Sequence, residues 1–261
     1  MSRIRAFLTH LSISAIVMGV ALAVIFLIWY PAPYFEIAGA GNIVRLLITV
    51  HLIAGPLLTL ILFRSGKPGL VFDLCCVALV QVSALTYGLS VIYSERPYYV
   101  VFAIDRFEVL ARKEVDESAI ADDRLKQKPW AEPIYAVASL PESMEEQQRL
   151  IDDVLKGKPD IERRPELWSV YSDKPEAVLR KATPLAEFSQ ARPDAAEYAR
   201  QLIDDAEIGV NLAGLPVVGK DGDRVLVIET DDLKPVGLIP VDPWAPAPAT
   251  NERSENGNPD A

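Results

Sequence analysis

Residues 94–261, almost two thirds of this 261-residue chain, contain neither histidine nor cysteine. This part therefore lacks the imidazole of a Ser-His-Asp or Cys-His catalytic arrangement and the usual ligands of zinc. The glycine-containing segment 66–69 lacks the spacing of a phosphate-binding P-loop. Carboxylates remain, but no pattern makes a pair of them converge. We expect no catalytic residue, no cofactor, no metal site and no small-molecule substrate, so the sequence predicts that the protein is not an enzyme.

Charge is scarce at the start of the chain and acidic afterwards. Residues 1–93 hold five basic and two acidic side chains, which leaves 21 of the 26 bases and 34 of the 36 acids for residues 94–261. This division excludes a single soluble domain. It also excludes a nucleic-acid partner, because such a partner needs clustered Lys and Arg, which the acidic part lacks.

Three long apolar stretches fill the first third of the chain, at residues 11–30, 43–63 and 74–93. Each has about 20 residues, and a helix of that length spans the roughly 30 Å of hydrocarbon in a bilayer. The alternative is three helices buried in a soluble core, but seven charged residues cannot cover their outer faces. An interfacial aromatic belt is expected after the first stretch. Its members are Trp29, Tyr30, Tyr34 and Phe35.

The first stretch can also be compared with a cleaved signal peptide. Arg3 and Arg5 precede it, and Ala38-Gly39-Ala40 has the form of a cleavage site. However, the apolar run is longer than the usual run of about 7 to 15 residues in a signal peptide. We expect it to remain as a membrane anchor.

The positions of basic residues predict how the chain is oriented in the membrane. Arg3 and Arg5 precede the first stretch, Arg64 and Lys67 lie in the second connector, and the first connector, 31–42, has no base. By the positive-inside rule both basic segments face the cytoplasm. Three crossings then place the C-terminal part in the periplasm of a bacterium. The prediction is a multi-pass inner-membrane protein, in contact with membrane lipid, with a cytoplasmic N-terminus.

Few polar side chains interrupt the apolar stretches. Gly55-Pro56 should loosen or kink the second helix, because proline removes one backbone hydrogen bond. His51 is the group that a proton relay would use, but a lone histidine near a helix entrance is more often satisfied by a nearby carbonyl. Cys75 and Cys76 point about 100° apart on a helix, so we expect packing residues rather than a redox pair. Candidates for hydrogen bonds between helices are Gln81, Ser83 and Thr86.

Residues 94–244 are enough for one α+β domain. Residues 98–102 are predicted as a strand, which residues 107–110 continue after the polar Asp105-Arg106 step, and residues 134–137 as another. Ser139-Leu140-Pro141-Glu142 matches a capping box, which predicts the start of an amphipathic helix that ends near Gly157. Residues 158–173 are interpreted as an ordered connector. Short helices are expected at 175–182, at 184–190 and from Asp194 onward.

The end of this domain has the clearest strand pattern. Residues 215–218, 224–229 and 236–239 are three short β-rich runs separated by turns, which predicts an antiparallel β-meander. After Trp244 the composition favours a disordered tail at 245–261. The sequence thus predicts three transmembrane helices in residues 1–93 and a periplasmic α+β domain in residues 94–244.

Five motifs, taken in order, resemble the type IV pilin accessory proteins of the TfpX/TfpZ type. They are Trp29-Tyr30-Pro31, Gly55-Pro56-Leu57-Leu58-Thr59-Leu60, Gly66-Lys67-Pro68-Gly69-Leu70-Val71-Phe72-Asp73-Leu74, Glu95-Arg96-Pro97 and Asp105-Arg106-Phe107. The resemblance extends to Pro240-Val241-Asp242-Pro243-Trp244 and leaves only the tail uncovered. It implies an inner-membrane, chaperone-like protein that assists a particular major pilin in assembly into type IV pili. It implies no catalytic or cofactor residue.

A pilin before assembly is held in the inner membrane by one apolar helix and has a periplasmic head. A partner with both parts can touch both halves at once, and linking two weak contacts raises the affinity. The candidate contacts with the pilin helix are Gly55, Pro56, Gln81, Ser83 and Thr86. The candidate contact with the pilin head is the strand edge of the meander. The alternative is that these residues only pack the protein against itself.

Two other functions stay open. The first is a membrane-anchored sensor whose periplasmic domain binds a small ligand. The second is a membrane hydrolase that uses carboxylates alone.

Overall fold

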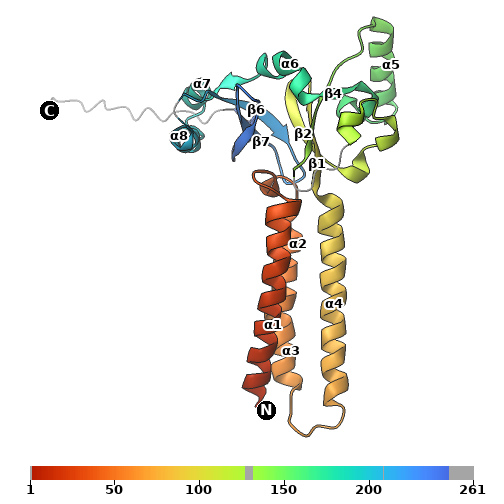
Figure 1. Cartoon of the computed structure of the whole chain (residues 1–261), viewed down its shortest axis with the longest axis vertical. Coiled ribbons are helices and arrows are strands. Elements are labelled where there is room, and N and C mark those ends of the chain that lie inside the picture. Colours follow the sequence, from red (N-terminus) through yellow and green to blue (C-terminus); the bar gives the residue numbers. More distant parts are fainter. Residues whose placement is uncertain (1, 127–131, 208, 247–261) are drawn as a thin grey trace, which may run out of the picture.

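The structure, a computed structural model, describes residues 2–126, 132–207 and 209–246. Three long helices form a stalk with a head of strands and short helices on one end, and the N-terminus and the 63–69 loop lie at the other end (Figure 1). All three are long and apolar enough to cross a membrane: Arg3–Trp29, Gly41–Leu62 and Leu70–Glu95. The chain is a membrane protein with the three predicted helices, and each helix begins before its predicted first residue.

The first span consists of α1 (Arg3–Val24) and a π-helical segment, η1 (Ile25–Trp29). It begins eight residues before the apolar stretch because the Ser2 side chain caps it and accepts a hydrogen bond from the Arg5 N–H. This earlier start places His10 inside the helix. At the other end, the hydroxyl of Tyr30 donates to the carbonyl of Ile92, which ties the first and third spans together.

The second span consists of α2 (Gly41–Ile48), the π-helical η3 (Thr49–Ala54) and α3 (Gly55–Leu62). Pro56 has no N–H, so the carbonyl four residues earlier loses its helical donor. The predicted loosening at Gly55-Pro56 takes the form of this π-helical segment, which ends just before Gly55.

The third span is a single helix, α4 (Leu70–Glu95). Gly69, with φ of 80°, precedes it, and a left-handed backbone there suits glycine. Gly88 lies against Leu47 of α2, and a Cβ at Gly88 would come within 2.6 Å of that side chain. The two helices therefore approach closely at this point.

The connector between the first two spans belongs to the head as much as to the stalk. It contains the 3₁₀ turn η2 (Tyr34–Glu36), and Tyr34 and Ile37 are buried in the same core as Val100 and Phe102 of the head. The carbonyl of Ile37 also accepts from the N–H of Asp221, at 3.0 Å. The prediction that Tyr30 and Tyr34 join an interfacial aromatic belt is wrong, because both are only 1% exposed and pack inside the protein.

Among the described residues, eight strands form one mixed sheet in the order β4-β3-β1-β2-β6-β7-β8, with β5 also paired to β6. The strands are β1 (Pro97–Ala103), β2 (Arg106–Ala111), β3 (Ile134–Ala138), β4 (Trp168–Val170), β5 (Thr183–Pro184), β6 (Leu212–Val218), β7 (Arg224–Glu229) and β8 (Pro235–Ile239). β6, β7 and β8 form the predicted antiparallel meander. Helices and a mixed sheet after three apolar helices confirm the predicted fold class.

Two local predictions in the head are wrong. Residues 107–110 do not continue the preceding strand: the chain reverses at Ile104 and Asp105, so β2 runs antiparallel to β1 as a hairpin. The capping box lies four residues later than predicted, because Ser143 rather than Ser139 caps the helix and accepts from the N–H of Glu146. The N–H of Ser139 instead donates to the carbonyl of Leu167 beside the sheet.

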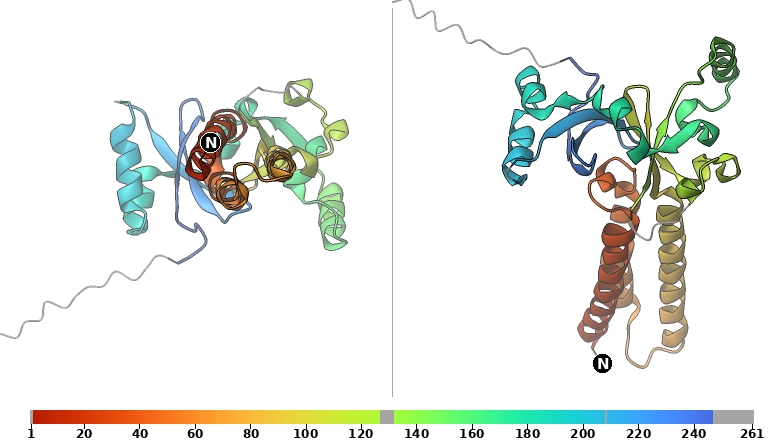
Figure 2. Two further views of the ribbon diagram at one scale, coloured as in Figure 1. Left: turned by 90° about the horizontal axis from the view of Figure 1, so that it is seen from below. Right: turned by 45° about the horizontal axis from the view of Figure 1, so that its top comes forward.

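Short helices surround the sheet, and Figure 2 shows them on either side of the strands. The α-helices are α5 (Met144–Leu155), α6 (Pro175–Leu179), α7 (Leu185–Ala191) and α8 (Ala196–Asp205). The 3₁₀ turns are η4 (Arg112–Glu114), η5 (Glu117–Ala119), η6 (Asp123–Lys126), η7 (Ile161–Arg163), η8 (Pro165–Leu167) and η9 (Tyr171–Asp173). The predicted connector 158–173 therefore contains β4 and several of these turns.

Side chains of β1 alternate between two cores, as the pleat of a strand requires. Val100 and Phe102 pack with the meander and the connector, whereas Tyr99, Val101 and Ala103 pack with β3, β4 and α5. This strand is buried along its whole length. It follows α4 directly, so the third span continues into the centre of the sheet.

The C-terminal segment is held by Arg192, whose guanidinium donates to the carbonyls of Asp242 and Ala245. The tail predicted at 245–261 lies outside the described residues from 247 onward. The division into residues 1–93 and 94–244 stays a prediction.

Candidate functional site

A polar cluster lies inside the helical stalk. Gln81 of α4, Thr59 of α3 and His10 of α1 meet there: His10 Nδ1 is 2.5 Å from Thr59 Oγ1, and His10 Nε2 is 2.7 Å from Gln81 Oε1. Thr59 and Gln81 are more than nine-tenths buried. The cluster joins all three spans at one level.

The Gln81 amide oxygen determines which groups donate hydrogen bonds in this cluster. An amide oxygen only accepts, so His10 Nε2–H donates to Gln81 Oε1. In the neutral ring Nδ1 then accepts, and the Thr59 hydroxyl donates to it. Gln81 Nε2 carries two further N–H groups and has no hydrogen-bond partner. The cluster is satisfied except for this donor.

His51 ties the π-helical segment to α4. Its Nδ1 lies 2.9 Å from the carbonyl of Leu47 and its Nε2 lies 3.2 Å from the carbonyl of Gln81. Both ring nitrogens therefore face backbone carbonyls, as expected for a histidine in an internal structural role. The π-helical geometry of η3 places this side chain toward α4.

Gly55 makes room for Gln81. A Cβ at Gly55 would overlap the amide of Gln81, and nothing but hydrogen fits at that position. Pro56 is buried beside it. The Gln81 side chain thus packs against the Gly55-Pro56 step.

A cavity of about 420 Å³ opens beside the cluster between α1 and α4. The polar residues that line this cavity are Thr9, His10, Ser14, His51, Thr59 and Gln81. The apolar residues that line it are Ala6, Ile13, Val17, Leu74, Ala78, Val82 and Leu85. We call this the α1–α4 groove.

The five residues predicted to contact a pilin helix do not lie together. Gly55, Pro56 and Gln81 converge inside the stalk, whereas Ser83 and Thr86 are exposed on other faces of α4. Their role in binding stays a prediction.

His10 and Thr59 belong to this cluster, and sequence reasoning did not single out either for it. His10 precedes the first apolar stretch by one residue, and only the helical start at Arg3 brings it into the bundle. Thr59 is the only hydroxyl of α3 and lies one turn after Gly55, on the same face. That spacing is the signal that would have found it.

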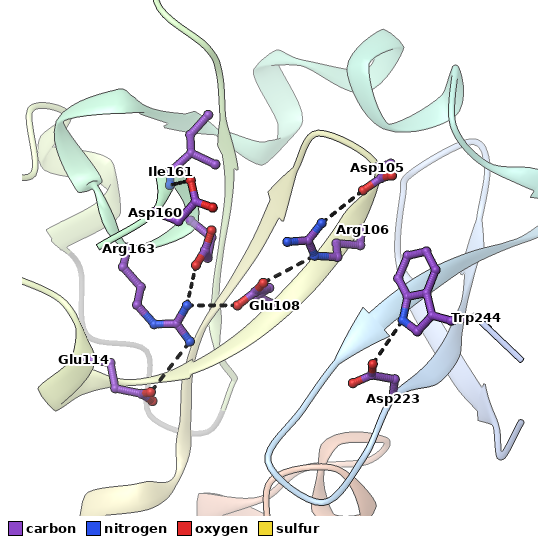
Figure 3. A network of polar contacts seen from close by, with 10 residues as sticks. Asp105, Arg106, Glu108, Glu114, Asp160, Ile161, Arg163, Asp223 and Trp244 are labelled. Atoms are coloured by element: carbon purple, nitrogen blue, oxygen red, sulfur yellow. Dashed lines mark hydrogen bonds and ion pairs between the residues drawn. The ribbon is translucent and has the colours of Figure 1, made fainter. Parts of the chain in front are cut away.

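The head contains a second polar network, shown in Figure 3. Arg163 of η7 pairs with Glu108 of β2 at 3.1 Å, with Glu114 at 3.9 Å, and with its neighbour Glu162. Burial and the nearby carboxylate of Glu162 raise the pKa of Glu108, against the opposite effects of Arg163 and Arg106. Arg163 is ion-paired with both buried carboxylates, Glu108 and Glu162, which favours a structural role for the network.

Two further features of the head concern binding. A cavity of about 760 Å³ lies between α7, α8 and β6, with Leu185, Ile203 and Leu212 among its walls. The sheet ends at β8, the strand edge predicted to meet a pilin head. Among the described residues, no group of three or more His, Cys, Asp or Glu side chains is placed to hold a metal ion.

Comparison with known proteins gives related sequences. The model of the family described as Fimbrial assembly protein FimB matches residues 1–39. The fimbrial assembly protein of Dichelobacter nodosus serogroup I is 29% identical over 243 residues, which cover 90% of this chain and 92% of the relative. The serogroup E1 protein is 29% identical over 240 residues, 89% of this chain and 93% of the relative. The protein of serogroups C1 and C2 is 34% identical over 111 residues, 42% of this chain and 82% of the relative. No solved structure matches the chain.

Proposed function

From the premise that this chain belongs to the FimB family of fimbrial assembly proteins, we propose that it assists the assembly of a cognate type IV pilin into pili. The observation that carries the proposal is the similarity to fimbrial assembly proteins over about nine-tenths of the chain. The role in fimbrial assembly follows from the family. Action on one pilin, chaperone-like and without catalysis, is the proposal.

The location is part of the proposal. Arg3 and Arg5 lie in the first turn of α1, and Arg64 and Lys67 lie in the loop between α3 and α4. Figure 1 shows the start of α1 and this loop at the end of the stalk opposite the head. The positive-inside rule then favours an inner-membrane protein with a cytoplasmic N-terminus and a periplasmic head. A reporter enzyme active only in the periplasm, fused after Trp244, should be active, and the same reporter in the 63–69 loop should be silent. The reverse pattern would overturn this orientation.

The junction between head and stalk supports the proposal that one pilin contacts both the membrane helices and the head. The first connector enters the head core through Tyr34 and Ile37, α4 continues into β1, and Glu95 at the end of α4 pairs with Lys113 and Lys220 of the head. Because the two parts are held together, a contact made in the membrane sets the position of the head. A second contact with the same pilin would then be intramolecular, which raises the combined affinity.

The decisive experiment is a deletion strain complemented with matched and foreign pilins. We expect loss of surface pili with normal abundance of the matched pilin, and little effect on a foreign pilin. Normal piliation with the matched pilin would overturn the proposal. Reduced pilin abundance would contradict action in polymerisation and indicate protection of the subunit from proteolysis.

The head cavity favours a second candidate function, a membrane-anchored sensor. Its volume of about 760 Å³ lies in the range of small-ligand sites. A thermal-shift screen of the full-length protein in detergent with a small-metabolite library tests it. A reproducible rise in Tm that Ile203→Trp abolishes would support the sensor, and no rise would count against it.

A further inference from the structure

A third cavity, of about 470 Å³, lies where the last turn of α4 meets the turns η4 and η5 of the head. Figure 1 shows this end of α4 at the base of the head. We call it the junction cavity. The charged residues that line it are Arg96, Arg112, Lys113, Asp116 and Glu117.

The depth of the junction cavity places it in the headgroup layer of a bilayer. The apolar stretch 74–93 forms about 30 Å of helix, which is the thickness of the hydrocarbon. Arg96 follows within about 5 Å, and lipid headgroups fill the layer of that thickness outside the hydrocarbon. The rings of Trp29 and Tyr93 pack 5.1 Å apart at this level, as aromatic side chains do at a membrane surface. The cavity is therefore within reach of lipid phosphates.

Three of the five charges are paired inside the protein. Arg112 Nε donates to the carboxylate of Glu117 at 2.8 Å. Lys113 pairs with Glu95 at the end of α4 and so holds η4 against the membrane span. These pairs leave Arg96 and Asp116 as the charges that a ligand can use.

Arg96 is half-buried and has no carboxylate partner within the part of the chain that the structure describes. There it forms one hydrogen bond, to the carbonyl of Tyr93 at 3.0 Å, which uses one of its five N–H groups. Its Cζ lies 3.9 Å from the centre of the Tyr93 ring and 5.1 Å from that of Tyr98. The two rings hold the guanidinium in place. A guanidinium held in this way offers paired N–H groups that match the oxygens of a phosphate.

Asp116 supplies the opposite charge. Its carboxylate accepts from the N–H of Ser118 at 3.0 Å and from the hydroxyl of Ser118 at 2.6 Å, and no described base pairs with it. The hydrogen bonds from Ser118 lower the pKa of Asp116, so the carboxylate is ionised at neutral pH. One cation and one anion around the same cavity match a zwitterion that carries a phosphate and an ammonium group.

We propose that the junction cavity binds the headgroup of a phospholipid with a primary ammonium, with Arg96 donating to the phosphate and the ammonium donating to Asp116. The acyl chains then lie along α4 beside Tyr93, which is 48% exposed. A quaternary ammonium has no N–H to donate to Asp116, and a headgroup without an ammonium leaves Asp116 unpaired. The inference goes beyond the proposed function and does not depend on it.

Native mass spectrometry of the full-length protein in detergent tests the lipid. The protein is titrated with phosphatidylethanolamine, phosphatidylglycerol or phosphatidylcholine of identical acyl chains, and the Kd of the first bound lipid is measured. We expect phosphatidylethanolamine to bind about threefold more tightly than the other two, since only it completes an ion pair with Asp116. Equal affinities, or tighter binding of phosphatidylglycerol, would overturn the proposal.

Variants of the two charges test their roles. Arg96→Gln should weaken phosphatidylethanolamine and phosphatidylglycerol alike, by about tenfold, because both lose charged hydrogen bonds to the phosphate. Asp116→Asn should weaken phosphatidylethanolamine about threefold and should not weaken phosphatidylglycerol. The control is Arg45→Gln: Arg45 is an exposed base near the head end of the second span, outside the cavity lining, and its loss should change neither affinity. Wild-type affinity in Arg96→Gln would overturn the proposal.

A pair of serine variants tests the cavity while both charges stay in place. Ser94 and Ser90 are exposed residues of α4 whose hydroxyls each donate to the carbonyl three residues earlier, and of the two Ser94 lines the cavity. Ser94→Trp fills the cavity and should abolish the preference for phosphatidylethanolamine, whereas Ser90→Trp should keep it. The same preference in both variants would overturn the proposal.

Inorganic phosphate separates a lipid from a soluble anion. Added at millimolar concentration, it should leave phosphatidylethanolamine bound, because the acyl chains contribute to the affinity of the lipid. Displacement of the first lipid by inorganic phosphate would overturn the assignment of the cavity to a lipid.

Discussion

At Gly55 the absence of a side chain determines how three helices meet. Gly55→Ala places a methyl group where the Gln81 amide lies, so Gln81 must move away from His10. We expect a loss of about 1–3 kcal/mol in stability, the usual cost of overpacking a filled interior. Thermal unfolding of the full-length protein in detergent measures it.

The matched control is Gly19→Ala on α1. Within 4 Å of an added Cβ at Gly19 there is no neighbouring atom, and alanine favours a helix more than glycine does, so this variant should unfold at or above the wild-type temperature. Equal stability of the two variants would contradict the assigned contact between Gly55 and Gln81.

Glu108 gives the head a pH dependence of known sign. Burial and the Glu162 carboxylate raise the pKa of Glu108 above its ordinary value. A raised folded-state pKa means a contribution to stability that is full below the unfolded-state pKa and is lost as the pH rises through the folded-state pKa. Wild type should therefore gain stability relative to Glu108→Gln as the pH falls from 7 toward 4. Denaturant titrations of both proteins at each pH measure the difference.

Other carboxyl groups do not obscure this comparison. Asp194, whose pKa the Arg192 hydrogen bonds lower, loses its contribution in acid, but it does so equally in both proteins. A difference that is constant with pH would show that Glu108 does not titrate abnormally.

At the scale of elements, Tyr34 of the connector η2 and Tyr135 of β3 share a hydrogen bond of 2.7 Å. Burial raises the pKa of Tyr135 to about 12 and that of Tyr34 well above its ordinary value, so both hydroxyls stay protonated at neutral pH. A double-mutant cycle of Tyr34→Phe and Tyr135→Phe should give a coupling of about 1 kcal/mol in unfolding free energy. Tyr198→Phe, on an exposed face of α8, should be neutral. A coupling near zero would contradict a hydrogen bond that joins connector and sheet.

Elements with a strong local pattern could be predicted from sequence, and elements fixed by distant partners could not. The three spans and the meander carry their own signals in apolar length and in strand runs with turns. β4 has three residues and exists because β3 pairs with it. The helix start at Ser143 competes with an equally good capping pattern at Ser139, whose N–H is taken by Leu167.

The same distinction applies to the candidate site. Gln81 and Gly55 are conspicuous in apolar stretches, so each could be selected from sequence. That they touch depends on the rotation of α3 against α4, which local pattern does not encode. His10 and Thr59 could not be paired with Gln81 for the same reason, since 49 and 71 residues separate the bonded partners.

At the scale of the whole molecule, the head depends on a segment that precedes two of the membrane spans. Tyr34 and Ile37 are at most 1% exposed and fill the core beside Phe102 and Leu215. A fragment of residues 94–246 lacks both side chains, and each vacancy of this size costs about 2–5 kcal/mol. Such a fragment should melt about 10 °C or more below the same fragment that carries residues 31–40 on a flexible N-terminal linker. Circular dichroism of the two soluble fragments measures the difference. Equal melting temperatures would mean that the head forms a complete core without residues 31–40. The connector would then pack on the head without contributing to its stability.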